Sequence, residues 1–409
     1  MLTLSFSRLA YVAFVLLSLG LVAGLGLLSS DAKDERVDLK VHEWGTFTSV
    51  AGRTGNALEW RPLSVESDLP SFVYSIDRVQ SKPPASATPG ALPQPQRTET
   101  PRLRYPSKSG TPVSVRMETP VLYFYTKDEM TVNVKVNFVG GKITEWYPQG
   151  NVVRGGIIDW GSITLLPGAH VDFPNDFREN HYYPARRTDA APIQTTNGQR
   201  EYEKFLFYRG VGNFNLPIFV GLEGNEVRIR NVHGEKLSRI ILFENREGKI
   251  GFRIQDIAQN EVVLDRPALG GKIAALRAEM KAMLISEGLY EKEANAMLDT
   301  WRDSWFEEGL RVFYLMPRSA TDEILPIEIK PEPLKLVRVL VGRTELITPE
   351  MEQSVLNELE KLQSPSPSVR AAALQAINKY GRFKEPILKE ILNRTTDARL
   401  RAIIERLSS

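Results

Sequence analysis

The sequence predicts an α+β protein with one N-terminal transmembrane helix, a mainly antiparallel β-sandwich body, a helical hairpin and a helical C-terminal tail. Three observations predict it. An unbroken apolar run occupies residues 9–28. Short segments of alternating apolar residues, separated by turn residues, follow between residues 41 and 266, as in sandwiches and barrels. After Pro267 the apolar residues mostly recur with the period of a helix.

Residues 1–30 are predicted to be a signal anchor. As a helix, the run from Leu9 to Leu28 would rise about 30 Å, which matches the core of a bilayer. A cleaved signal peptide has a shorter apolar region, of about 7 to 15 residues, and a small-x-small cleavage site. The candidates at 22–24 and 30–32 fit that pattern poorly. We therefore expect residues 9–28 to stay in the lipid bilayer; the alternative is a secreted or periplasmic protein after signal cleavage.

The orientation of the anchor follows from the basic residues near its ends. The leader carries Arg8 and no acidic residue, whereas Lys33, Arg36 and Lys40 behind the run argue weakly for the opposite orientation. A very short leader normally leaves the following chain translocated. We expect a protein of the bacterial envelope, anchored in the cytoplasmic membrane, with residues 31–40 as a tether and the body outside the cytoplasm.

The composition excludes several classes of function. The chain has no cysteine, which removes disulfides, thiolate metal sites and cysteine nucleophiles. The formal net charge is +2 and both signs are evenly mixed, so no nucleic acid partner is expected.

Residues 41–266 are predicted to form the β-sandwich region, with a Pro-rich insertion at 80–112 that suits neither a helix nor a central strand. The clearest expected hairpin joins residues 119–126 to 131–138, and Gly140 with Gly141 should turn the chain into a third strand at 143–147. Further strands are expected at 156–166, 204–208, 217–222, 226–232, 238–244, 250–256 and 261–264.

Two helical regions follow. Residues 267–347 are predicted to be a helical hairpin, interrupted at Gly288, plus short strands at 310–316 and 334–341. Residues 348–409 are predicted to be a helical tail, with helices at 349–362, 366–380, 384–393 and 396–407. Residues 366–392 resemble one HEAT-type repeat. Because fewer than three such repeats are seldom stable alone, we expect this tail to dock on the β body.

Common catalytic motifs are absent: the sequence has no P-loop, G-x-G-x-x-G, H-E-x-x-H or G-x-S-x-G. His42 precedes Glu43 and Trp44 in a predicted strand. Alternation places His42 and Trp44 on one face and Glu43 on the other, so His42 and Glu43 could not ligate one ion without a bulge in the strand. We expect an edge-strand histidine packed on Trp44.

The long connection at 167–200 holds the best candidates for a site. His170 and Asp172, on one face of an extended segment, are candidate ligands of a divalent metal together with His181. The segment 181–190 adds Arg186, Arg187 and Asp189 to the imidazole and two tyrosines. An imidazole can act as a base and arginines can bind an anion. The alternative is a solvated loop whose arginines pair with Glu179 and Asp189.

Five segments carry a resemblance, and it spans most of the chain from Val41 to about Leu346. They are VHEWGTFTSVAG, RMETPVLYFYT, NHYYPARRTDAAP, EKFLFYRGVGNF and WFEEGLRVFYLMPR. They resemble a family of exported bacterial proteins that brings no established activity. The resemblance implies one shared body and assigns no catalytic residue.

Together these patterns predict a membrane-anchored extracytoplasmic binding or assembly protein of the cell envelope, with an envelope protein or polysaccharide as partner. The alternative is a hydrolase, metal-dependent or acting on carbohydrate, with a site around residues 170–189. Exposed tryptophans would favour sugar stacking, but burial in the core is commoner. The four in the β region are Trp44, Trp60, Trp146 and Trp160.

A reporter fused behind Ser409 tests the orientation. Alkaline phosphatase needs disulfides and is active only outside the reducing cytoplasm, so we expect high phosphatase activity from this fusion. Deleting residues 9–28 should abolish that activity. An inactive fusion, with the body shielded from protease in intact spheroplasts, would place the body in the cytosol.

Overall fold

The computed structural model describes residues 37–52, 55, 57–60, 69–76, 113–153, 155–196, 198, 200–237, 239–256 and 260–408. The predicted anchor at 9–28, the first part of the tether and the Pro-rich insertion at 80–112 lie outside these ranges. Within them, no helix combines the length and apolar character needed to cross a membrane. The last residues of the expected tether, from Val37, already belong to the first strand.

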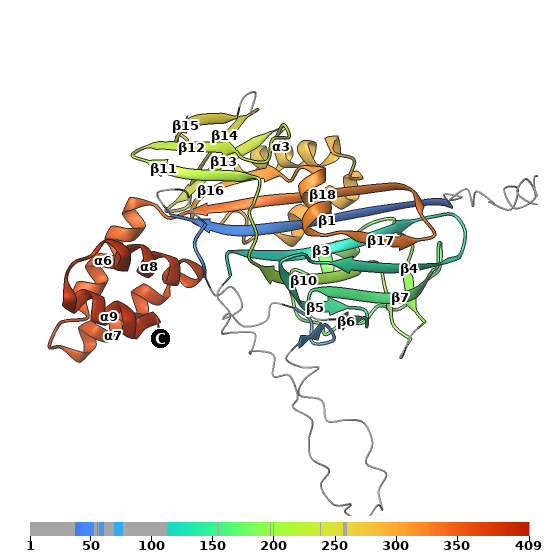
Figure 1. Cartoon of the computed structure of the whole chain (residues 1–409), viewed down its shortest axis with the longest axis horizontal. Helices are drawn as coiled ribbons and strands as arrows, with labels where there is room; N and C mark the ends of the chain where they lie inside the picture. The colour runs from blue at the N-terminus through green and yellow to red at the C-terminus, as the bar shows by residue number, and fades with distance from the viewer. Residues whose placement is uncertain are drawn as a thin grey trace, which may run out of the picture.

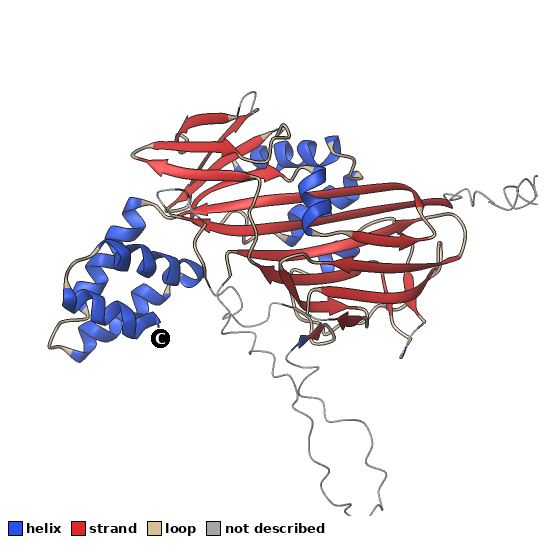
Figure 2. Cartoon of the chain, in the orientation of Figure 1, coloured by secondary structure: helices blue, strands red, loops and turns tan. Residues whose placement is uncertain are grey.

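The described chain is a mixed α and β structure with mostly antiparallel sheets (Figure 2). The central sheet has nine strands in the order β14-β13-β16-β18-β1-β3-β10-β5-β2. Their bounds are β1 Val37–Ala51, β2 Tyr74–Ser75, β3 Val115–Tyr125, β5 Gly141–Tyr147, β10 Leu206–Gly212, β13 Ile240–Arg246, β14 Lys249–Gln255, β16 Gly309–Leu315 and β18 Pro333–Leu346.

Two smaller sheets complete the β structure. The first contains β4 Met130–Asn137, β6 Asn151–Val153, β7 Ile157–Leu165, β8 Ile193–Thr195, β9 Tyr202–Glu203 and β17 Ile327–Lys330. The second contains β11 Ile218–Glu223, β12 Glu226–Asn231 and β15 Glu261–Asp265.

One continuous apolar core lies between the central sheet and the two smaller sheets. It joins Phe47 and Leu340 of the central sheet to Val134 of β4 and Ile229 of β12. Alternation along β4 is as the sequence predicts, because Val132, Val134 and Val136 are buried while their neighbours are more exposed. All four tryptophans of the β region are also buried: Trp44, Trp60, Trp146 and Trp160. Their burial removes the exposed rings on which sugar stacking would depend.

The opposite face of the central sheet is covered by helices and by the long connection (Figure 1). The helices α3 (Ile273–Ser286) and α4 (Glu291–Thr300) form the expected hairpin. Leu276 and Met280 of α3 and Met297 of α4 are buried in this second core. The connection contributes Tyr182 in front of the short helix η2 (Tyr183–Arg186), which packs against α4.

The predicted hairpin between residues 119–126 and 131–138 is wrong. Strand β3 pairs with β1 and β10, whereas β4 pairs with β7 and β17 in another sheet. The chain therefore crosses from one layer to the other after Tyr125. The two strands were found correctly, but alternation identifies only buried faces and leaves the pairing open.

The centre of the large sheet is a parallel pair, β1 and β18, which the sequence analysis did not foresee. Their register runs from Val37 opposite Pro333 to Ala51 opposite Leu346. Strand β1 is therefore central, flanked by β18 and β3, and not the expected edge strand.

The C-terminal tail consists of four helices, gathered at one end of the molecule (Figure 1). They are α6 Pro349–Lys361, α7 Pro367–Asn378, α8 Lys384–Arg394 and α9 Ala398–Ser408, with the short helix η3 (Gly381–Phe383) between α7 and α8. Their bounds lie within about two residues of those expected. The tail packs on the body through a third core that includes Val50, Trp60 and Ile347. One more helix, α5 (Arg318–Ile324), lies between β16 and β17.

Buried charges join the central strands on both faces. On the face of the smaller sheets, Arg338 Nε donates to Glu43 Oε2 at 2.5 Å and Arg338 Nη1 donates to Asp322 at 2.7 Å. Tyr208 donates to the other Glu43 oxygen at 2.5 Å. On the opposite face, Arg311 donates to Glu345 at 3.0 Å and its remaining donors bind the carbonyls of the turn before β16.

Replacing Glu43 by Gln tests how much the buried ion pair between Glu43 and Arg338 contributes to stability. Both side chains are fully buried, so the change leaves the Arg338 charge without its main counterion. We expect the free energy of unfolding, from denaturant titration, to fall by about 3–5 kcal/mol. As a control, Lys135 lies 3.9 Å from Glu328 in an exposed ion pair. Lys135→Gln should change the free energy of unfolding by less than about 1 kcal/mol. Equal effects of the two variants would contradict the assignment.

Candidate functional site

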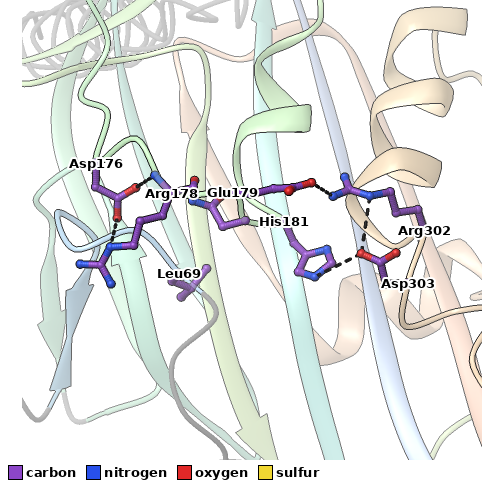
Figure 3. A pocket seen from close by; sticks show the side chains of 8 residues that line it. Leu69, Asp176, Arg178, Glu179, His181, Arg302 and Asp303 are labelled. Atoms are coloured by element: carbon purple, nitrogen blue, oxygen red, sulfur yellow. Dashed lines mark hydrogen bonds and ion pairs between the residues drawn. The ribbon is translucent and has the colours of Figure 1, made fainter.

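A pocket of about 400 Å³ lies in the region that the sequence singled out (Figure 3). The turn after α4 supplies Arg302 and Asp303, and the long connection between β7 and β8 supplies Asp176, Arg178, Glu179, Asn180 and His181. Leu69 closes one side. Of the candidate catalytic residues that the sequence singled out, His181 lines this pocket, whereas Asp189, Arg186 and Arg187 do not.

The imidazole of His181 is held in one orientation. Its Nδ1 lies 2.7 Å from the carbonyl oxygen of Thr300, which can only accept, so Nδ1 carries the proton. Its Nε2 lies 3.9 Å from Asp303 on the pocket side (Figure 3). This arrangement fixes the ring and leaves Nε2 able to accept a hydrogen bond from a ligand.

Charged side chains of both signs line the rest of the pocket. Arg302 donates to Glu179 at 2.8 Å and lies 3.5 Å from Asp303. Asp176 accepts hydrogen bonds from Tyr183 and from the backbone of Ser71, at 2.7 and 3.0 Å. Burial acts to raise the pKa of Asp176, but the hydrogen bonds outweigh it and hold that pKa below its usual range. Asp176 therefore stays ionised at neutral pH.

Phe177 lies in the chain between two residues that line this pocket, Asp176 and Arg178, and is not itself a lining residue. Its side chain is 91% exposed, whereas no other large apolar side chain of the described residues exceeds 53%. Its backbone lies in the left-handed region, with φ of 58°. A non-glycine residue in that region is strained by about 1–3 kcal/mol and persists where the surroundings enforce it. Here the Phe177 N–H donates to Asn175 at 2.7 Å.

Arg186 joins the connection to the body and does not line the pocket. Its guanidinium donates to both oxygens of Glu203, at 2.9 and 2.6 Å, and to the carbonyl of Pro174. Its central carbon lies 4.9 Å from the ring centroid of Tyr183 and 5.3 Å from that of Phe173. Burial would lower the pKa of Arg186, but Glu203 raises it above its ordinary value. The alternative of a solvated loop would have paired this arginine with Glu179 or Asp189, whereas its partners are Glu203 and Pro174.

The other two candidates of the segment make exposed ion pairs with α4. Arg187 lies 3.3 Å from Asp299, and Asp189 accepts from Lys292 at 2.6 Å. Both pairs are open to solvent and contribute little each. They tie the connection to the helical hairpin.

The metal prediction finds no support in the geometry. His170 and Asp172 are exposed, and no group of three His, Asp or Glu side chains in the described ranges is placed to hold an ion. His170, Asp172 and His181 therefore do not form the expected ligand set.

His42, Glu43 and Trp44 are all buried in the central sheet. His42 and Trp44 do share a face, opposite Glu43, as alternation predicts. The ring of His42 packs on Tyr125 and Tyr290, and its Nδ1 lies 2.9 Å from Glu293. His42 therefore joins the helical hairpin to the central strand β1, whereas Glu43 binds Tyr208 and Arg338 on the other face.

Sequence reasoning missed the residues that complete the pocket. Arg302 and Asp303 lie more than a hundred positions from the connection, and only the packing of α4 on η2 brings them near. Phe177 had a usable signal, because it is a lone apolar residue among charged ones in a long loop.

No family model matches the chain, and no curated protein matches it. Among solved structures, the Fcho1 Mu homology domain of Danio rerio with bound Eps15 peptide is similar at a TM-score of 0.28 and 6% identity. The alignment covers 77% of this chain and 99% of that one. A likeness of this size carries no argument about function.

Neighbouring arginines provide a matched test of the connection. Arg186→Lys removes the bidentate contact with fully buried Glu203, so we expect a loss of about 2–4 kcal/mol in unfolding free energy and faster proteolysis within 167–200. Arg187→Lys, at an exposed position, should leave both unchanged. Similar proteolysis rates for the two variants would refute the anchoring role of Arg186.

Proposed function

We propose that this protein is a membrane-anchored extracytoplasmic binding or assembly protein of the cell envelope. Its contact site is the pocket beside Phe177, and its partner is an envelope protein or polysaccharide. The observation that carries this proposal is the exposed, strained Phe177 beside a pocket of fixed charges. Aromatic side chains are the commonest anchors of binding interfaces, and strain in a backbone points to a constrained role.

The charges around the pocket support binding over catalysis. Arg302 pairs with Glu179, Arg178 lies 3.9 Å from Asp176, and the ring of His181 is fixed by the carbonyl of Thr300. A ring that is already fixed costs little entropy when a partner docks. Positive and negative side chains both line the pocket. Such a lining suits a partner that carries both hydrogen-bond donors and hydrogen-bond acceptors.

We further infer that the three sheets form a β-sandwich and that the tail is HEAT-like. The apolar core shared by the central and smaller sheets supports the first inference. The packing of α6 with α7 and of α8 with α9 supports the second.

A hydrolase remains the alternative. It would use Nε2 of His181 as a base, the role for which its fixed tautomer suits it. The metal-dependent form of this alternative lacks a ligand set among the described residues. We favour binding, because the other titratable groups of the pocket are already paired.

Photocrosslinking at Phe177 tests the proposal. Replacing Phe177 by benzoylphenylalanine in the full chain, within native envelopes, should give a discrete adduct after irradiation. The same replacement at Val232, also exposed but on another sheet, should not give that adduct. On a denaturing gel, a sharp adduct band would indicate a protein partner, whereas a ladder or smear would indicate a polysaccharide.

The charge reversal Arg178→Glu should reduce the adduct by about tenfold, since an ionic contact at a partner is lost. Phe177→Ala should leave the unfolding free energy within about 0.5 kcal/mol of the wild-type value. Identical adducts from positions 177 and 232, or none from 177, would refute the proposed contact site.

A further inference from the structure

The imidazole of His181 and the carboxylate of Asp303 lie close together at the pocket beside Phe177, but they do not form a hydrogen bond with each other. His181 Nε2 and Asp303 Oδ2 are 3.9 Å apart (Figure 3). A hydrogen bond between nitrogen and oxygen is about 2.7 to 3.2 Å long, so this separation is too wide for one. A donor atom placed between the two groups can lie about 2.8 Å from each of them.

Both groups present hydrogen-bond acceptors to each other. The proton of the neutral His181 ring is on Nδ1, which donates to the carbonyl of Thr300 at 2.7 Å, so Nε2 presents a lone pair. The ionised carboxylate of Asp303 has no proton to donate. A ligand group that bridges these two side chains therefore has to donate at least two hydrogen bonds.

The charges of the lining favour a cation. The charged side chains that line the pocket are three carboxylates and two guanidiniums, which belong to Asp176, Glu179, Asp303, Arg178 and Arg302. With a neutral imidazole on His181, the lining carries one net negative charge. A positively charged donor is therefore attracted to the pocket more strongly than a neutral donor such as a hydroxyl group.

Arg302 is shared between two carboxylates and binds only one of them closely. Its Nη2 donates to Glu179 at 2.8 Å, whereas its Nε lies 3.5 Å from Asp303. The side chain of Asp303 is 67% exposed, so a small rotation toward an incoming donor meets little resistance. Asp303 is therefore the carboxylate of the pocket that is best placed to bind a second cation.

We propose that the pocket binds a primary ammonium group, which lies between His181 Nε2 and the Asp303 carboxylate and donates a hydrogen bond to each. This inference rests on the proposed function and names the chemistry by which the same site recognises its partner. An ammonium group has three N–H donors, so it satisfies both acceptors, whereas a hydroxyl group has one donor and satisfies only one. Its positive charge also balances the net charge of the lining.

Two kinds of partner carry a primary ammonium group: a protein, on a lysine side chain, and a polysaccharide, on an amino sugar that is not acetylated. The pocket volume of about 400 Å³ lies toward the lower end of the range for small-ligand sites, about 300–1,000 Å³. That volume suits one side chain or one sugar ring. Both partners offer the same ammonium chemistry, and matched probes distinguish them.

Titration of the purified full chain in detergent, with NMR of selectively labelled histidine rings as the readout, tests this proposal. The chain has four histidines, and the His181 signal is the one that is absent from His181→Gln. The probes are Nα-acetyl-lysine methylamide and glucosamine, each compared with its form acetylated on the amine. Tetramethylammonium chloride, a cation without N–H donors, serves as the reference for charge alone.

We expect a saturable shift of the His181 signal with at least one free amine, and no such shift with the acetylated forms or with tetramethylammonium. A shift with the lysine derivative alone would indicate a protein partner, and a shift with glucosamine alone would indicate an amino-sugar polymer. Equal responses to the free and acetylated probes, or no response to either free amine, would overturn the proposal.

A matched pair of variants tests the role of Asp303. Asp303→Asn keeps the shape of the side chain and removes its charge, so binding of the amine should weaken by about tenfold or more. Asp189→Asn, at an exposed carboxylate outside the pocket, should leave binding unchanged. Both positions are exposed, so both variants should keep the Tm of the wild-type chain. Unchanged binding by Asp303→Asn, or equal weakening in both variants, would also overturn the proposal.

The ammonium site and the proposed contact site fail in different ways. If neither amine binds while benzoylphenylalanine at position 177 still gives its adduct, the contact site stands and recognises another chemical group. If an amine binds and position 177 gives no adduct, the ammonium site stands and the contact at Phe177 is refuted.

Discussion

The parallel pairing of β1 with β18 is the constraint on which the rest of the structure depends. It joins the first strand of the described body to the last, from Val37 opposite Pro333 to Ala51 opposite Leu346. A buried ion pair between Glu43 of β1 and Arg338 of β18 joins the two strands, and Glu345 of β18 is paired in turn with Arg311 of the next strand, β16. A buried charge left without its partner is costly, so the pair between Glu43 and Arg338 favours this register over a shifted one.

The place of the tail and the candidate site both follow from that pairing. Strand β18 leads directly into α6, so the tail begins where the central sheet ends and Arg382 can reach Glu345. On the same face, His42 of β1 and Tyr125 of β3 contact Glu293 of α4. That contact sets the position of α4, and the turn after it brings Arg302 and Asp303 against the connection at 167–200. The pocket beside Phe177 is thus built from segments that meet only after the sheet has formed.

The sequence predicts elements better than it predicts their partners. Helical periodicity located α6 to α9 closely, and alternation identified β4 and its buried valines. Neither pattern reports which strand lies beside which, so β3 and β4 were assigned to one hairpin and β1 to an edge. The same lack of information on spatial neighbours applies to the site. His181 could be selected because it lies in a long loop, whereas nothing in the sequence places Asp303 beside that loop. The surroundings of Arg186 could not be predicted, because only the fold shows that Glu203 and four aromatic rings lie around its guanidinium.

Disulfide trapping between β1 and β18 tests this account most directly, because the natural chain has no cysteine. Ser49 and Thr344 are opposite each other in the register, and their side-chain oxygens lie 3.2 Å apart. The double variant Ser49→Cys with Thr344→Cys should form an intramolecular disulfide under mild oxidation, seen by mass spectrometry as a cross-linked peptide pair. Ser49→Cys combined with Ser162→Cys, on another sheet, should stay reduced. Failure of the first pair to form in folded protein, or equal oxidation of both pairs, would contradict the parallel arrangement.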